Sequence, residues 1–147
     1  SHLWGLVKSG LESLLGDCER LGVTFGLENG YNVAHTAELT VRMCRELSHP
    51  KLKLVYDVAN AVMVESPLDG LDLVVKDLAL LHVSDTDDKV WGHDRIGTGV
   101  IDFATVTEKV KKIGYAGPTI MEIVDRRTPD ESNRVSLQRL QALGWTT

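Results

Sequence analysis

The stretch Leu78–Asp87, LALLHVSDTD, decides the fold. Four apolar residues run directly into His82, and Ser84 and Asp85 follow it. A run this apolar predicts a strand buried on both faces, which is typical of a parallel sheet. A histidine and carboxylates at the end of such a strand are costly when they bind nothing. We therefore expect a ligand at this end of the strand.

Three other strand-like runs also carry an acidic residue at or near their carboxyl end. They are GVTFGLE ending in Glu28, LKLVYD ending in Asp57, and PTIMEIV carrying Glu122. The chain therefore contains four expected strands, each with an acidic residue or a histidine at or near its carboxyl end.

Apolar residues at helical spacing separate these strands. Helices are expected over residues 3–21, 37–47, 71–78 and 103–113, with a last helix ending near residue 143. Residues 63–71 are expected to form a loop, as are residues 85–99. A leading helix followed by alternating strands and helices predicts a parallel sheet with right-handed crossovers.

Both doubly wound sheets and (β/α)8 barrels have this alternation, and the placement of polar residues favours the barrel. Each acid or histidine lies toward the carboxyl end of its strand, and the residues two positions earlier are Gly26, Val55, Leu80 and Ile120. Small and branched side chains of this kind fill the layers inside a barrel, whose active site lies at the carboxyl-terminal rim. Adjacent strands would bring the four polar groups to one point.

The length fits only part of such a barrel. The chain has 147 residues, whereas a complete barrel takes about 250. We expect one domain over residues 1–147 that forms a half barrel, strands 5–8, with a leading helix. Its two outer strands would be unpaired edges and its inner face an exposed apolar surface.

Composition excludes several classes of function. A net charge of −5 argues against a nucleic-acid-binding surface, and it fits a protein whose acids include metal ligands. No apolar run approaches the roughly 20 residues needed to cross a bilayer. Cys18 and Cys44 lie on apolar helical faces and are interpreted as reduced thiols, consistent with a cytoplasmic location.

Five motifs together carry a family resemblance. They are GLEN (26–29), LVYDVANA (54–61), LLHVSDTD (80–87), WGHDRIGTGVIDF (91–103) and IMEIVD (120–125). In this order and at these intervals, the chain resembles the C-terminal half of the xylose-isomerase-like TIM-barrel superfamily, specifically its sugar phosphate isomerase and epimerase group.

The resemblance implies that Glu28, Asp57, His82 and Glu122 bind one divalent metal ion, and that Glu28 and Glu122 also form the catalytic acid/base pair. Three carboxylates and one imidazole suit Mn²⁺, Mg²⁺ or Co²⁺, with Zn²⁺ also able to bind. The implied substrate is a small carbohydrate, a sugar or a sugar phosphate, converted by proton transfer through an enediolate.

Other polar residues have two interpretations each. Asn60, His93 and Arg95 are candidates for substrate binding, but His93 can equally be an exposed loop histidine and Arg95 a surface residue. Asp85 and Asp87 are interpreted as solvated loop acids, the alternative being that they orient the histidine or the loop. The three tryptophans are assigned to packing or to an interface.

Alternatives to an isomerase or epimerase remain open at this point. A polyol dehydratase would use the same site. A truncated half barrel would bind only metal or a partner. An apurinic endonuclease is disfavoured because that chemistry needs more metals and more histidines, and because the chain is acidic. A homo-oligomer, or a second chain that completes the barrel, is the expected partner.

Overall fold

A computed structural model describes residues 2–30 and 33–146. The elements in chain order are α1 (His2–Leu21), β1 (Phe25–Glu28), α2 (Ala37–Leu47), β2 (Leu52–Asp57), α3 (Val58–Val62), α4 (Pro67–Val74), β3 (Leu78–Val83), α5 (Phe103–Lys112), β4 (Thr119–Met121) and α6 (Pro129–Ala142).

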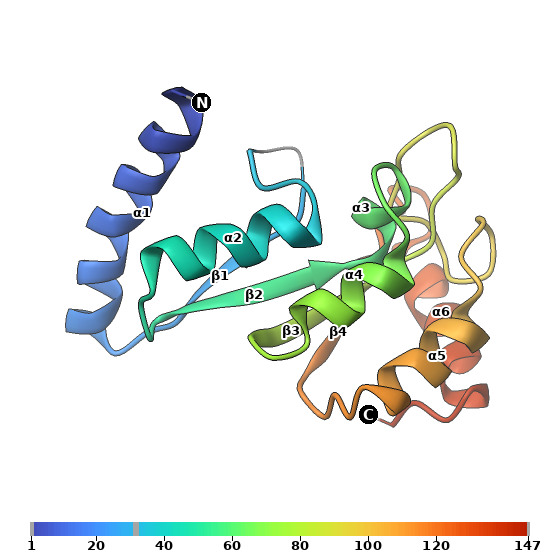
Figure 1. Cartoon of the computed structure of the whole chain (residues 1–147). Coiled ribbons are helices and arrows are strands. Elements are labelled where there is room, and N and C mark those ends of the chain that lie inside the picture. Colours follow the sequence, from blue (N-terminus) through green and yellow to red (C-terminus); the bar gives the residue numbers. More distant parts are fainter. Residues whose placement is uncertain (1, 31–32, 147) are drawn as a thin grey trace.

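The strands form one parallel sheet in the order β1-β2-β3-β4, so that each strand pairs with the next strand in the chain. Figure 1 shows this sheet with α2 and α4 on one side of it. Parallel neighbours joined through helices are the repeating unit of α/β folds. The predicted alternation of strands and helices is confirmed.

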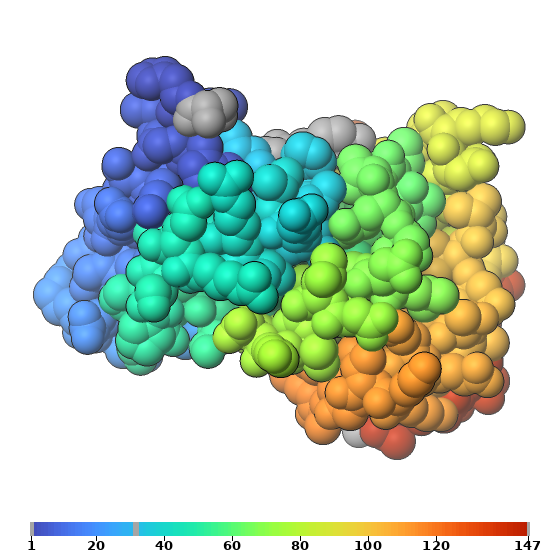
Figure 2. Space-filling view, in the orientation of Figure 1, coloured from blue at the N-terminus to red at the C-terminus, as the bar shows by residue number. Residues whose placement is uncertain are grey.

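One face of the sheet is covered by helices and holds the main core. The side chains of Leu54, Tyr56, Leu81 and Val83 point to this face and are fully buried. They alternate along β2 and β3, as the two-residue period of a strand requires. Helices α2 and α4 form much of the near surface of the molecule in Figure 2.

The opposite face of the sheet is far less covered. Val55 and Leu80 on this face are only half-buried, and Ile120 is 50% exposed. Within the described residues, β1 and β4 each pair with one strand only. The half barrel predicted from the sequence, with an exposed inner face and open edges, is therefore confirmed.

The junction between α1 and β1 corrects the expected start of the first strand. Gly22 lies at φ +72, and the Val23 N–H donates to the Cys18 carbonyl at 3.0 Å. A left-handed glycine with this six-to-one hydrogen bond is a Schellman ending. Gly22 therefore ends the helix, as its type predicts, and β1 starts at Phe25 rather than at residue 23.

The start of α4 is also different from the expectation. Residues 63–71 were expected as a loop, but the helix begins at Pro67 with Ser66 as N-cap. Proline is favoured in the first helical turn because its missing N–H has no partner there anyway. Residue 70 lies inside this helix, and only glycine fits there, because a Cβ would be 1.8 Å from the Tyr56 hydroxyl oxygen.

Other boundaries agree more closely with the sequence. Thr36 caps α2 and Asp102 caps α5, each through its own side chain. Strand β4 is shorter than expected and ends at Met121, although the Glu122 N–H still donates to the Val83 carbonyl at 3.1 Å. No helix in the described part of the chain is long and apolar enough to cross a membrane.

The contact between Gly70 and Tyr56 makes a prediction about stability. Gly70→Ala would push the Tyr56 hydroxyl away from Glu65 Oε1, its partner at 3.1 Å. We expect a loss of about 1–3 kcal/mol in the free energy of unfolding, measured by urea denaturation. Gly16→Ala is the matched control, because the Gly16 position in α1 has no atom within 4 Å and should gain about 0.5–1 kcal/mol. Equal effects of the two changes would contradict this account.

Candidate metal centre

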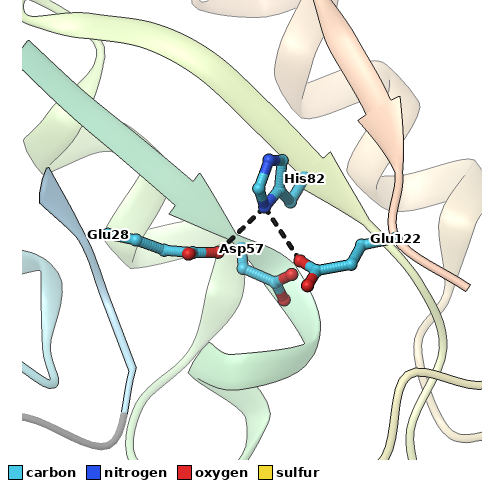
Figure 3. A group of neighbouring side chains, drawn as sticks. All are labelled: Glu28, Asp57, His82 and Glu122. Carbon is cyan, nitrogen blue, oxygen red and sulfur yellow. Dashed lines mark hydrogen bonds and ion pairs between the residues drawn. The ribbon is translucent and has the colours of Figure 1, made fainter. Parts of the chain in front are cut away.

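Four polar side chains converge at the carboxyl-terminal edge of the sheet. Glu28 ends β1, Asp57 ends β2, His82 lies near the end of β3, and Glu122 directly follows β4. Each offers one ligand atom, and these atoms all lie within 4.8 Å of one another. Figure 3 shows the four side chains pointing toward a common point. The structure therefore brings together all four residues that the sequence analysis proposed as ligands.

The strand register explains the convergence. Asp57 is paired with His82, whereas Glu28 is level with Val55, two residues before the end of β2. His82 is in turn level with Ile120, two residues before Glu122. The proposed ligands are thus offset by two residues between β1 and β2 and between β3 and β4, a stagger of the kind found in barrels. A stagger in steps of two keeps every ligand on the same face of the sheet.

His82 lies at the centre of the cluster. Its Nδ1 is 2.9 Å from Glu28 Oε1 and 2.9 Å from Glu122 Oε2. Nδ1 carries at most one proton, so it can donate to only one of these carboxylates. The ring nitrogen therefore faces two acceptors from the first and last strands of the sheet.

Two buried oxygens in the cluster accept no hydrogen bond. They are Asp57 Oδ2 and Glu122 Oε2. A buried carboxylate oxygen without a donor is costly, and two of them beside a third carboxylate repel one another. A divalent cation facing these oxygens and an imidazole nitrogen would remove both costs. The four residues therefore fit a metal ion in donor type and in position.

The surroundings shift two pKa values upward. Burial raises the pKa of Asp57 from 3.8 to about 6, against the backbone hydrogen bond from Asn60, which lowers it. The hydrogen bond with Glu28 raises the pKa of His82 above its ordinary value. Both shifts describe a crowded anionic cluster that takes up protons to reduce its charge.

Backbone and amide hydrogen bonds fix the end of β2. The Asp57 N–H donates to Asn29 Oδ1 at 2.8 Å, and Asn29 Nδ2 donates to the Asp57 carbonyl at 3.0 Å. The Asn29 side chain thereby extends the β1–β2 pairing beyond the last residue of β1. Asn29 is fully buried, and sequence reasoning assigned it no role, because an asparagine after a strand is usually a turn residue.

Asn60 lies at the rim beside Asp57, where the sequence analysis placed a substrate contact. Its Nδ2 donates to the Asn29 carbonyl at 2.9 Å, and its Oδ1 accepts from Trp91 Nε1 at 2.8 Å. Trp91, which is predicted to serve packing or an interface, is 39% exposed and belongs to the long loop after β3. The two side chains bridge this loop to α3.

His93 is a buried residue. Its side chain is only 7% exposed, so the interpretation as an exposed loop histidine is wrong. Its Nδ1 lies 2.8 Å from Ser84 Oγ and 3.6 Å from Asp57 Oδ2. The structure therefore places the His93 ring beside the carboxylate of Asp57, one of the proposed metal ligands.

Arg95 is bound to the start of α6. Its Nη2 donates to Ser132 Oγ at 2.9 Å, and its Nη1 lies 3.8 Å from Glu131 Oε1. Asp125 at 4.0 Å is a further acidic neighbour. These contacts tie the guanidinium to α6 and to the loop before it, and they partly neutralise its charge.

Asp85 is the clearest correction in this region. It was interpreted as a solvated loop acid, but it is fully buried. Its carboxylate accepts from the N–H groups of Thr86, Gly97 and Ile101 at 3.0, 2.8 and 3.1 Å. Asp85 therefore organises the loop, which was the alternative interpretation. Asp87 is exposed, as expected.

Comparison with known proteins decides the family. The model of the family described as xylose isomerase-like TIM barrel matches residues 2–143. The chain belongs to this family. Because the match covers nearly the whole chain, the family resemblance seen in the five sequence motifs is confirmed.

Individual relatives are identical to this chain at about a quarter of the aligned positions. An uncharacterized protein of Methanocaldococcus jannaschii is 26% identical over 140 residues, covering 90% of this chain and 48% of its own length. L-ribulose-5-phosphate 3-epimerase UlaE of Escherichia coli is 25% identical over 134 residues, covering 90% and 47%. The chain therefore spans about half the length of these relatives.

The fold is shared with a solved structure of D-psicose 3-epimerase with D-tagatose from Clostridium cellulolyticum H10. The TM-score is 0.79 at 19% identity, and the match covers 95% of this chain and 56% of the other. At this identity the likeness establishes the fold. It supports the description of this chain as about half of a TIM barrel.

The raised pKa values predict that cation binding depends strongly on pH. A cation needs Asp57 ionised and His82 neutral, and protons compete at both positions. Because the pKa of Asp57 is about 6 and that of His82 is also raised, the affinity should fall by about 100-fold or more from pH 8 to pH 5. Calorimetric titration with Mn²⁺ across this range measures the change.

The same shifts set the sign of the stability change. In the metal-free protein both groups hold protons more tightly when folded than when unfolded. The contribution of Asp57 to stability therefore declines as pH rises from about 4 to about 6, and that of His82 declines as pH rises above 6.5. Saturating Mn²⁺ should reverse this trend, with a larger rise in melting temperature at pH 8 than at pH 5. An affinity for Mn²⁺ that is constant over this range would contradict the assignment of these ligands.

Proposed function

We propose that the cluster holds one divalent cation and that the protein is an epimerase or isomerase acting on a ketose or ketose phosphate. The observation that carries the proposal is the convergence of Glu28, Asp57, His82 and Glu122 within 4.8 Å, with two buried oxygens that accept no hydrogen bond. Oxygen-rich sites with one imidazole suit Mn²⁺, Mg²⁺, Co²⁺ or Zn²⁺.

The names of relatives support the substrate class. UlaE is named for L-ribulose 5-phosphate, and the solved D-psicose 3-epimerase is described with D-tagatose. Both names denote inversion at carbon 3 of a ketose, next to the carbonyl. A hydrogen at such a carbon becomes acidic when the carbonyl is polarised. We therefore infer proton abstraction beside a carbonyl as the reaction class.

Glu28 and Glu122 are suited to opposite halves of a proton transfer. They come from the first and last strands of the sheet, and they contact the same nitrogen, His82 Nδ1, at 2.9 Å each. A bound metal ion supplies a Lewis acid for the substrate oxygens. One glutamate takes the proton beside the carbonyl to leave an enediolate, and the other returns a proton from the opposite side, which inverts the carbon.

Further substrate contacts are proposed from the rim. Asn60 lies three residues after Asp57 and lines a cavity of about 870 Å³ together with Trp91. Arg95 lines a second cavity of about 400 Å³ with Arg126 and Arg127. An amide at the first cavity suits sugar hydroxyls, and guanidinium groups at the second suit a phosphate or a carboxylate.

We also propose that a further half barrel covers the exposed inner face, supplied by a second copy in a homo-oligomer or by a second chain. The edges β1 and β4 run in the same direction, so the β4 edge of one copy can pair with β1 of another at two equivalent junctions. Helix α1 also carries exposed apolar side chains, Leu3, Leu6 and Leu14. Figure 2 shows the amino-terminal end of α1 standing above its neighbours.

Glu122→Gln tests the catalytic assignment. The amide keeps the size of the side chain but cannot exchange a proton as a carboxylate does. At saturating Mn²⁺ we expect loss of about 100-fold or more in the exchange of solvent deuterium into carbon 3 of D-tagatose or L-ribulose 5-phosphate, followed by NMR. Glu108→Gln is the control, because Glu108 is an exposed residue of α5. Exchange at an undiminished rate in Glu122→Gln would rule out this glutamate as acid or base.

Self-association is a separate prediction. If a second copy closes the barrel, the purified chain is a dimer. Pairing would cover the open edges β1 and β4 of each copy and the exposed inner face of each sheet. Light scattering at micromolar concentration measures the mass. A stable monomer would eliminate the second copy as the completing half.

A further inference from the structure

The two carboxylate oxygens of Asp57 have different roles. Oδ1 accepts from the backbone N–H groups of Ala59 at 2.7 Å and Asn60 at 2.8 Å, and it thereby caps α3. Oδ2 is buried and accepts no hydrogen bond. A carboxylate held in this way offers a single oxygen to the cluster.

An imidazole from the long loop lies against that free oxygen. His93 Nδ1 is 3.6 Å from Asp57 Oδ2, which is longer than a hydrogen bond. The same nitrogen is 2.8 Å from Ser84 Oγ, and Ser84 is fully buried. Ser84 therefore holds the edge of the ring beside Oδ2 without engaging that oxygen, whose lone pairs stay available.

The position of the ring is fixed from several sides. Asp85 and Asp94 form an antiparallel bridge with hydrogen bonds of 3.0 and 2.7 Å, and the His93 carbonyl accepts from the Val124 N–H at 2.8 Å. The ring packs edge-on against Trp91, with centroids 4.9 Å apart. The backbone is thus tied to the ends of both β3 and β4, and the side chain has little freedom to move.

We propose that Ser84 and His93 are positioning residues of the metal centre, which hold Asp57 so that Oδ2 faces the cation. This inference rests on the proposed metal site. The backbone of α3 fixes one oxygen of the carboxylate, and the imidazole blocks rotation of the other away from the cluster. An oriented ligand binds metal more tightly, because the cost of ordering it is already met in the folded protein.

Titration with Co²⁺ tests the inference. His93→Leu removes the ring edge and Ser84→Ala removes the group that holds it. We expect each variant to bind Co²⁺ about 10- to 100-fold more weakly than the wild type. The visible absorption of bound Co²⁺ should also change, because a rotated Asp57 alters the coordination geometry.

Two further variants separate positioning from a general loss of structure. His93→Asn places an amide nitrogen near the position of Nδ1, and it should restore most of the affinity and the spectrum. Val90→Ala is the control in the same loop, because Val90 is 71% exposed, and it should bind as the wild type does. Circular dichroism of each variant reports whether it is folded.

The outcomes distinguish this inference from the metal site itself. Wild-type affinity and spectrum in both His93→Leu and Ser84→Ala contradict the positioning role and leave the metal site standing. Weaker binding with an unchanged spectrum and no recovery in His93→Asn also overturns it, since that pattern indicates a merely structural role. Absence of Co²⁺ binding by the wild type contradicts the proposed metal site, and the positioning role with it.

Discussion

The structure depends on the confinement of negative charge at one end of a parallel sheet. Asp57 Oδ2 and Glu122 Oε2 are buried and accept no hydrogen bond, and Glu28 lies on the other side of the same imidazole. Such an arrangement costs free energy in the metal-free protein. A cation at the centre would make it favourable, so the feature that weakens the fold locally is also the one on which the proposed function rests.

The sheet creates this arrangement through topology. Every strand of a parallel sheet presents its carboxyl end at the same edge. The positions of the proposed ligands are offset by two residues between β1 and β2 and again between β3 and β4, and they are level between β2 and β3. The helices pack on the other face, where Tyr56 and Leu81 are fully buried. The core thus holds the strands in register, and the register brings together four polar residues that are far apart in the sequence.

Much of this could be predicted from local pattern. Apolar runs ending in Asp57 and His82 identified the strands and the edge at which the ligands gather, because burial and strand period act on neighbouring residues. The start of α4 and the burial of Asp85 could not be predicted in the same way. Gly70 is accommodated by contact with Tyr56, and Asp85 by three N–H groups of a folded loop. Both depend on contacts that exist only after the chain has folded.

The residues around the centre show the same limit. A histidine in a charged loop is typical of the surface, yet His93 is held under the loop by Ser84 and Trp91. Its burial follows from the bridge between Asp85 and Asp94, which the sequence pattern does not reveal. Sequence alone therefore indicated the four proposed ligands, while the burial and the contacts of His93 became visible only in three dimensions.

Anomalous diffraction from crystals grown with Mn²⁺ tests the central claim most directly. The account predicts one anomalous peak among Glu28, Asp57, His82 and Glu122, at about 2.0–2.4 Å from Asp57 Oδ2 and from an oxygen of each glutamate. A peak elsewhere, or its absence at this position under saturating Mn²⁺, would contradict the claim that these strands build a metal centre.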